Sequence, residues 1–341
     1  MTISLREYRG QPPTGQTGGL TVGVDLGGTK IAAGTVDPGG AVVSRVRIPT
    51  PRDPDRIAGA IAEAVQRVRQ GRDDVRAVGI GAAGHVDAER STVRFGPNPG
   101  RHDKAIRDIV QEATGLPVVV ENDANAAAWG EFIHGAGAGH EDMLMVTAGT
   151  GFGGGIISRG RLLRGPFGLA GEIGHYRAVP DGLPCPCGQH GCMEQYASGA
   201  AHTRRAREMA AADPRYAAVV LALGDGTPSG LHGHHVTEAA RRGDPFSLDV
   251  FARSGRWLGQ ALADLASILD PSVLVIGGGL GDTGELIRRP AEVSYRRALG
   301  GGAYRAHAEV RTATVGQDAG LIGAANLARL HELISFPAAS R

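Results

Sequence analysis

The residues Leu20–Lys30, LTVGVDLGGTK, combine a strand pattern with a glycine turn that follows directly after an acid. Apolar residues alternate along Leu20–Asp25, and a Gly-Gly-Thr turn then leads into a second apolar run, Ile31–Val36. The chain turns once more, through a proline and two glycines, into Ala41–Ile48. Apolar runs joined by short glycine turns predict three consecutive antiparallel strands.

The order of elements that begins with these strands occurs twice along the chain. Helical and strand patterns follow in alternation, and the whole series predicts two α/β lobes with mixed sheets. In the first copy they are a helix over Ile57–Val68, a strand over Val75–Ile80, a helix near 104–114, a strand over Pro117–Glu121 and a helix from Asp123. In the second copy they are a strand over Met143–Thr147, a hairpin of Gly154–Ser158 with Arg161–Leu163, a helix over Trp257–Ala266, a strand over Val273–Ile276, a helix near 285–299, a strand over Ala308–Thr314 and a helix near 321–333.

The predicted boundaries follow this repeat. We expect a flexible N-terminal tail over 1–19, an N-terminal lobe over 20–135 and a C-terminal lobe over 136–341, with a cleft between the lobes. Within the second lobe, residues from about 194 to 250 have the pattern of a helical insertion with loops.

Composition limits the classes of function. The chain has 341 residues, of which 42% are hydrophobic and 21% charged, as in globular proteins. A net charge of +1 gives no electrostatic reason to expect binding to nucleic acid or membranes. We find no apolar run of about 18 residues and no signal peptide in the N-terminal segment, so a cytoplasmic protein is expected. We also expect a homo-oligomer, either a dimer or a tetramer.

Two glycine-rich turns stand at equivalent places in the two repeats. Such turns allow backbone N–H groups to converge on phosphate oxygens, and Asp25 at the end of the first strand is placed to hold Mg²⁺. A plain tight hairpin is the alternative for either turn alone. Together they predict a clamp on one polyphosphate. The residues concerned are Gly27, Gly28, Thr29 and Lys30 in the first turn and Thr147, Gly149, Thr150 and Gly151 within the second, Thr147–Gly155.

A third glycine cluster follows the strand Val273–Ile276. Read from Gly279, it satisfies the G-x-G-x-x-G pattern of dehydrogenases, but it lies late in the chain without a convincing βαβ unit that carries a ribose-binding acid. A close approach of the backbone at Gly278 and Gly279 to an adenine or ribose fits the sequence better.

An acid and two amides surround the end of the strand Pro117–Glu121. Helix capping is the ordinary role of Asn122 or Asp123 at such a place. The carboxyl ends of strands are also where α/β proteins bind ligands, so Asp123 is a candidate base for a substrate hydroxyl. A helix N-terminus favours the ionised form and makes a weak base, which suffices for phosphoryl transfer.

All three cysteines lie within eight positions. With His175, the thiols of Cys185, Cys187 and Cys192 offer a closed tetrahedral zinc set, and His190 is the rival fourth ligand. A disulfide is disfavoured in a reducing compartment, and inert buried thiols are the other alternative. A fully ligated zinc would be structural and would fix the loop 175–192. The flanking Glu172 and Glu194 are either surface glutamates or, with His175, acceptors for several sugar hydroxyls.

With these motifs assembled, the chain resembles the ROK family of sugar kinases and repressors, and most of all its actinobacterial ATP-dependent glucokinases. The resemblance covers nearly everything after Gly19. It is carried by Asp25–Lys30, Glu121–Asn125, Thr147–Gly155, Gly171–His175 and the pattern Cys185-x-Cys187-Gly-x-x-Gly-Cys192-x-Glu194.

The resemblance implies the two-lobed, actin-like (RNase H-like) ATPase fold and phosphorylation of glucose on its 6-hydroxyl. By the same resemblance Asp123 is the general base, His175 and the three cysteines bind zinc, and the glycine turns hold ATP and Mg²⁺. The residues implied to contact glucose are Asn98, Asn122, Asp123, Glu172, His175 and Glu194. The alternatives are a kinase for another hexose or N-acetylhexosamine, such as fructose or N-acetylmannosamine, a non-catalytic sugar sensor, and the dehydrogenase above.

Overall fold

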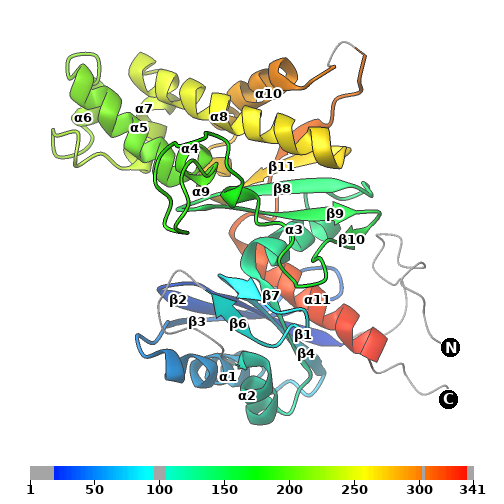
Figure 1. Ribbon diagram of the computed structural model, residues 1–341. Coiled ribbons are helices and arrows are strands. Elements are labelled where there is room, and N and C mark those ends of the chain that lie inside the picture. The colour runs from blue at the N-terminus through cyan, green and yellow to red at the C-terminus, as the bar shows by residue number, and fades with distance from the viewer. Residues whose placement is uncertain (1–18, 96–104, 302–303, 336–341) are drawn as a thin grey trace. The chain divides into compact units, whose positions relative to one another are not determined.

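The structure is a computed structural model that describes residues 19–95, 105–301 and 304–335 (Figure 1). Residues 1–18 of the predicted tail, which was 1–19, lie outside this range, and so does Asn98. The chain forms two compact units. Unit 1 comprises Met1–Met143, Gly155–Gly171 and Thr314–Arg341, and unit 2 comprises Leu144–Gly154 and Glu172–Ala313. The last segment of the chain therefore groups with unit 1, although chain order alone places it at the end of the second repeat.

The first sheet confirms the three antiparallel strands predicted from residues 20–48. β1 pairs antiparallel with β2, which pairs antiparallel with β3, while β1–β4 and β4–β7 are parallel pairs. The order across the sheet is β3 (Val42–Pro49), β2 (Lys30–Val36), β1 (Leu20–Leu26), β4 (Val75–Ala82) and β7 (Val118–Asn122).

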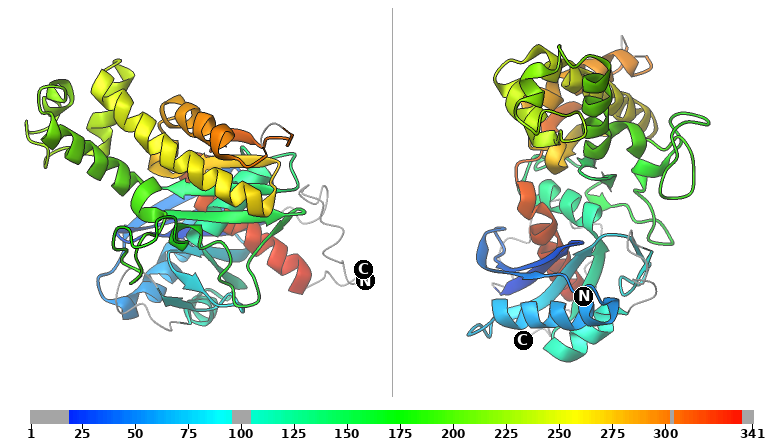
Figure 2. Two further views of the ribbon diagram at one scale, coloured as in Figure 1. Left: turned by 45° about the horizontal axis from the view of Figure 1, so that its top comes forward. Right: turned by 90° about the vertical axis from the view of Figure 1, so that its left-hand side faces the viewer.

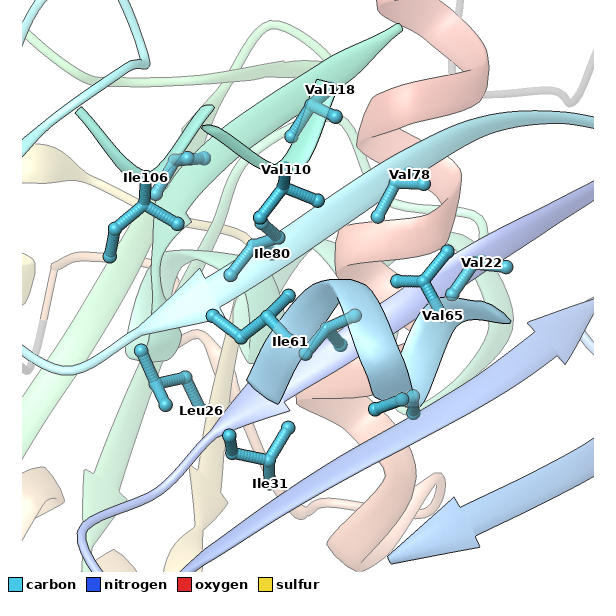
Figure 3. Close-up of a cluster of buried hydrophobic side chains, with 14 of the residues drawn as sticks. Val22, Leu26, Ile31, Ile61, Val65, Val78, Ile80, Ile106, Val110 and Val118 are labelled. Carbon is cyan, nitrogen blue, oxygen red and sulfur yellow. The ribbon is translucent and has the colours of Figure 1, made fainter. Parts of the chain in front are cut away.

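One face of this sheet carries branched apolar side chains and is covered by two helices. α1 (Ile57–Val68) and α2 (Ile106–Thr114) present Ile61, Val65 and Val110 to it (Figure 3). Because successive residues of a strand point to opposite faces, the residues that meet these helices occur at alternate positions. They are Val22, Val24, Val78, Ile80, Val118 and Val120, each at most 2% exposed.

The opposite face is built from small residues, which let a helix backbone lie directly on the sheet. α11 (Ala319–Ser335) and α3 (Asp123–His134) cover this side (Figures 1 and 2). A Cβ atom added at Gly79 of β4 would lie 1.8 Å from the carbonyl oxygen of Ala324. The two helices approach each other as closely, since a Cβ at Gly323 would lie 1.7 Å from the carbonyl oxygen of Ala126.

The contact at Gly323 predicts a large loss of stability for Gly323→Ala. Its methyl group would meet rigid backbone, and relief requires α3 and α11 to move apart, at a cost of about 3 kcal/mol. Gly59→Ala is the matched control, because Gly59 is also helical, in α1, but its Cβ would enter open space. That substitution should stabilise by roughly 0.5–1 kcal/mol. Denaturant midpoints measure both, and equal effects would contradict the proposed contact.

The second sheet has the order β10 (Arg161–Leu162), β9 (Phe152–Ser158), β8 (Met143–Ala148), β11 (Val273–Gly277) and β12 (Glu309–Thr312). In chain order these strands occupy the same positions as those of the first sheet. The prediction of two mixed sheets built on one repeated order is confirmed. The short turn 149–151 joins β8 to β9, so the glycine-rich segment predicted as one turn up to Gly155 is strand from Phe152 onward.

The predicted insertion from about 194 to 250 contains several helices, as expected. α8 (Pro245–Leu269) packs along α10 (Glu285–Ala298), and Gly255 and Gly259 allow the close approach. α8 begins earlier than predicted because Asp244 caps it and Pro245 occupies its first turn. The remaining helices of the insertion are α4 (Glu194–Ala197), α5 (Gly199–Ala212), α6 (Ala218–Leu221) and α7 (Gly233–Arg241).

Several short elements were not predicted. These are the two-stranded pair β5 (His85–Val86) and β6 (Val93–Phe95), the helix α9 (Gly278–Gly281), and the 3₁₀ turns η1 (Pro54–Arg56), η2 (Ile173–His175) and η3 (Gly316–Asp318). The predicted strand, helix and strand over 273–314 form a βαβ unit, in which β11 and β12 are parallel and α10 connects them. Within the ranges that the structure describes, none of the helices is both long enough and apolar enough to cross a membrane.

Candidate active site

The first phosphate turn lies at the carboxyl end of β1. Gly27 N–H donates to the carbonyl of Lys30 at 3.0 Å, and the Thr50 hydroxyl donates to the carbonyl of Gly27 at 2.8 Å. Gly28, Thr29 and Lys30 are exposed, as a turn that receives a ligand must be. The turn is thus held at its base and open at its tip.

Asp25 and Asp123 lie near one another in unit 1. Strand register explains this, because Asp25 of β1 is level with Gly81 of β4 and Glu121 of β7. Burial raises the pKa of Asp25, and the Asp123 carboxylate raises it further. Two carboxylates that repel each other form a group that binds a divalent cation more readily than either alone.

Asn122 and Asp123 occupy the start of α3. Asn122 is the N-cap: its Oδ1 accepts the Asn125 N–H at 3.0 Å, and its Nδ2 donates to the carbonyl of Gly84 at 3.2 Å. Asp123 Oδ1 accepts the N–H of Ala124 at 2.8 Å. Burial nevertheless raises the pKa of Asp123 above its ordinary value. The expectation that the helix N-terminus makes it a weak base was wrong in direction, because desolvation outweighs the amide.

Behind these residues lies a buried charge network that the sequence did not reveal. The Glu121 side chain is 1% exposed and pairs with Arg90 at 2.5 Å and with Arg164 at 2.9 Å. Its other oxygen accepts the Asn122 N–H at 3.0 Å and the Asn125 amide at 3.1 Å. Burial raises the pKa of Glu121, but the two guanidinium groups lower it below its ordinary value overall. Glu121 thereby fixes the backbone from which Asp123 projects.

A second buried carboxylate, Glu131, holds the other end of α3. It is fully buried, and its Oε1 accepts the Val315 N–H at 2.7 Å and the Gly316 N–H at 3.2 Å. Its Oε2 accepts the N–H groups of Ala136 and Thr314 at 2.9 and 3.0 Å. The segment that leads into α11 is therefore tied to α3 by charge-assisted bonds.

The second phosphate turn, 149–151, is anchored by the helices that follow the cysteine loop. Gly149 N–H donates to the carbonyl of Gly151 at 3.0 Å, and Gly199 at the start of α5 donates to the carbonyl of Gly149 at 2.7 Å. Phe152 N–H donates to Glu194 Oε2 at 3.1 Å. Thr147 lies in β8 just before the turn, and Thr150 is exposed at its tip.

The third glycine cluster has a structural explanation at one of its two predicted residues. Gly278 has φ +76°, and a Cβ atom there would lie 2.8–2.9 Å from the backbone of Ala148, at the end of β8. Gly279 faces open space. The cluster forms the four-residue helix α9 rather than the start of a long helix, as a dinucleotide-binding motif requires.

The four predicted zinc ligands come together. The ligand atoms of His175, Cys185, Cys187 and Cys192 all lie within 4.8 Å of one another, and the cysteines form no disulfide. Cys187 Sγ is 3.6 Å from Cys192 Sγ, and Cys185 Sγ is 3.8 Å from His175 Nδ1. His190 lies outside the cluster, with its Nδ1 3.3 Å from the carbonyl oxygen of Gly182.

These spacings suit zinc. Zn–S bonds of about 2.3 Å in a tetrahedron separate two sulfur atoms by about 3.8 Å. Two short bridges, Arg177 with Cys192 and Pro184 with His190, close the loop around the ligands. The donor set is complete with four protein ligands, so the metal would be structural and would leave no position for an activated water.

Two glutamates flank this cluster. Glu194 is the first residue of α4, and its Oε1 lies 3.8 Å from Cys185 Sγ. Glu172 precedes η2 and is exposed, and its carbonyl accepts the His175 N–H at 3.1 Å. The structure thus gathers Glu172, His175 and Glu194 around the cysteine loop in unit 2, and Asp25, Asn122 and Asp123 in unit 1.

The chain matches one protein family, and it is similar to proteins of known function and to solved structures. The profile of the ROK family matches residues 21–331. The glucokinase of Streptomyces coelicolor is 54% identical over 311 residues, which cover 91% of this chain and 98% of that protein.

Two solved structures are similar to this chain. The ROK family glucokinase from Streptomyces griseus in complex with glucose and AMPPNP has a TM-score of 0.84 and 55% identity, covering 92% of this chain and 100% of that one. The ROK hexokinase from Thermus thermophilus has a TM-score of 0.76 and 38% identity, covering 92% and 98%.

Proposed function

Because this chain belongs to the ROK family, we propose that it is an ATP-dependent glucokinase, which transfers the γ-phosphate of ATP to the 6-hydroxyl of D-glucose. The observation that carries the proposal is the placement of Asp123. It is the first residue of α3, directly after β7, and lies near Asp25 in a carboxylate pair next to the first phosphate turn. The relatives named glucokinase supply the choice of sugar and donor.

In the proposed reaction, Asp123 takes up the hydroxyl proton and Asp25 binds the metal ion. As the 6-oxygen attacks the γ-phosphorus in line, Asp123 accepts the hydroxyl proton and the bond from the γ-phosphorus to the departing ADP oxygen breaks. The raised pKa of Asp123 makes it a better proton acceptor than an exposed aspartate. Asp25 lies near the same carboxylate and would hold Mg²⁺.

Sugar recognition is assigned to three acceptors in or beside the cysteine loop of unit 2 and to Asn122 of unit 1. Asn122, Glu172, His175 and Glu194 would receive the glucose hydroxyls, with Asn98 as a further contact. His175, Cys185, Cys187 and Cys192 would hold zinc, which would fix the loop and take no part in the chemistry. Phosphates would lie on the turns at Gly27–Lys30 and Gly149–Gly151, with Thr147 beside the latter and Gly278 and Gly279 close to the nucleoside.

A matrix of sugars against phosphoryl donors tests the assignment. Glucose with ATP should give the highest kcat/KM, above fructose, N-acetylmannosamine and mannose, and polyphosphate should support less turnover than ATP. A coupled assay for ADP and direct detection of the sugar phosphate measure this. A preference for another sugar would overturn the choice of glucose, and nicotinamide binding without phosphoryl transfer would overturn the kinase.

The cellular setting is part of the same proposal. A cluster of free thiols that binds zinc is compatible with a reducing compartment, so we place the protein in the cytoplasm. We assign it a homo-oligomeric state, either a dimer or a tetramer.

A further inference from the structure

Glu194 is bonded on one side to the phosphate turn and lies on the other beside the cysteine loop. Its Oε2 accepts the N–H of Phe152, the residue that directly follows the turn, at 3.1 Å. Its Oε1 lies 3.8 Å from Cys185 Sγ, next to the acceptors assigned to glucose. One planar carboxylate therefore joins two parts of unit 2 to which different ligands have been assigned.

The helix that carries Glu194 is held firmly. Arg205 of α5 donates to the carbonyl of Tyr196 at 2.9 Å, and Arg204 donates to the carbonyl of Gln195. The Tyr196 ring packs on Trp257 of α8 with centroids 4.5 Å apart. The side chain of Glu194 therefore starts from a fixed backbone, and a shift of its carboxylate is passed to the turn rather than absorbed by α4.

The turn, in contrast, has little other support. Outside the strand pairing, its backbone bonds among the described residues are the one from Gly149 to Gly151 and the one that Gly199 donates from α5. A Cβ atom at Gly151 would lie 2.7 Å from Glu194 Oε2, whereas a Cβ at Gly149 would enter open space. The position of the carboxylate and the conformation of the turn at Gly151 are thus mutually constrained.

We infer that Glu194 is a positioning residue that couples glucose binding to nucleotide binding. A sugar hydroxyl that donates to Oε1 orients the carboxylate, and Oε2 then holds the Phe152 amide and sets the turn for the triphosphate. By linkage the effect is reciprocal, so nucleotide on the turn favours the sugar-binding orientation of Glu194. This inference rests on the proposed function, and it adds a residue through which the two substrates promote each other's binding.

The first test is a substitution in the phosphate turn with a readout at the sugar. Calorimetric titration of glucose into zinc-loaded Gly151→Ala without nucleotide should show a Kd about 5- to 10-fold higher than in the wild type. Gly149→Ala is the matched control, because its methyl group does not meet Glu194, and its glucose Kd should stay within about twofold. Equal effects of the two substitutions would overturn the inference, since they would indicate a general disturbance of the turn.

The reverse test uses Glu194→Gln, whose amide keeps the size of the side chain. Its amide oxygen can still accept the Phe152 N–H, so without glucose the Kd for adenylyl imidodiphosphate should stay within about threefold, whereas saturating glucose should no longer tighten nucleotide binding. An unchanged nucleotide Kd together with wild-type synergy would overturn the inference. Zinc content and thermal melting show whether Gly151→Ala folds. If it does not fold, the Glu194→Gln experiment alone tests the coupling.

The outcomes separate this inference from the proposed function. A wild-type protein that binds no glucose contradicts the glucokinase assignment. A wild-type protein that binds glucose and nucleotide with affinities independent of each other retains that assignment and overturns the coupling.

Discussion

Asp123→Ala is expected to lower kcat by about 10²- to 10⁴-fold while the Kd for glucose stays within about threefold. The carboxylate makes its principal contribution in the transition state, when the hydroxyl proton is in transfer, so its loss affects turnover far more than ground-state binding. Stopped-flow or coupled assays give kcat, and calorimetry gives the glucose affinity. Near-normal kcat, or loss of folding in a melting experiment, would contradict the assigned role.

Asp123→Asn is the sharper companion variant. An asparagine can keep the hydrogen bond that Asp123 accepts from Ala124 N–H, but it cannot take up a proton. It should be as inactive as the alanine variant and fold as well as the wild type. In the wild type, the base must be ionised, and burial raises its pKa, so kcat should fall on the acid side at a higher pH than an ordinary aspartate would give. Residual turnover in Asp123→Asn should lose this acid limb.

Periodicity explains why most of the sheet was predictable. In β1 and β4 the branched residues that face α1 and α2 alternate with small ones, and the Gly-Gly turn after Asp25 marks where the chain reverses. An apolar run followed by a glycine-rich turn recurs at Met143–Gly155, so the repeat was visible in the residues themselves. Elements as short as β5 and β6 carry too few residues to establish a period.

The long-range packing contacts of α11 with the first sheet were not predictable from the sequence. α11 is apolar and rich in small residues. Its sequence does not indicate, however, that Leu321 lies against Gly23 and Ala324 against Gly79 of the first sheet. Its place depends on close backbone approach between residues about 240–300 positions apart, a tertiary property rather than a local one.

In the candidate site, too, contacts between residues close in sequence were predictable and long-range contacts were not. Ligands close in sequence, such as Cys185, Cys187 and Cys192, were predicted and come together because short glycine-rich turns leave few alternatives. A buried acid requires a cationic partner, and none was predicted for Glu121. Which arginines provide it depends on β7 meeting Arg90 and Arg164, which are 31 and 43 positions away, and no local pattern identifies them.

Removal of zinc should damage sugar binding far more than nucleotide binding. Cys187→Ser takes one thiolate from the four-ligand set, so the loop that carries His175 loses its fixed shape, and the KM for glucose should rise about 10- to 100-fold. The Kd for adenylyl imidodiphosphate without glucose should change by less than about threefold, because α4 keeps Glu194 on Phe152 through the Arg205 bond to Tyr196.

His190→Ala is the control for this experiment. His190 belongs to the same loop but lies outside the ligand cluster, so this variant should retain one zinc per chain and a wild-type KM for glucose. Metal content measured by atomic emission must accompany every kinetic value, for the substituted protein and for wild type treated with a chelator. Full glucose affinity in protein verified to be free of zinc would contradict a structural role for the metal, because the acceptors would then hold their positions without it.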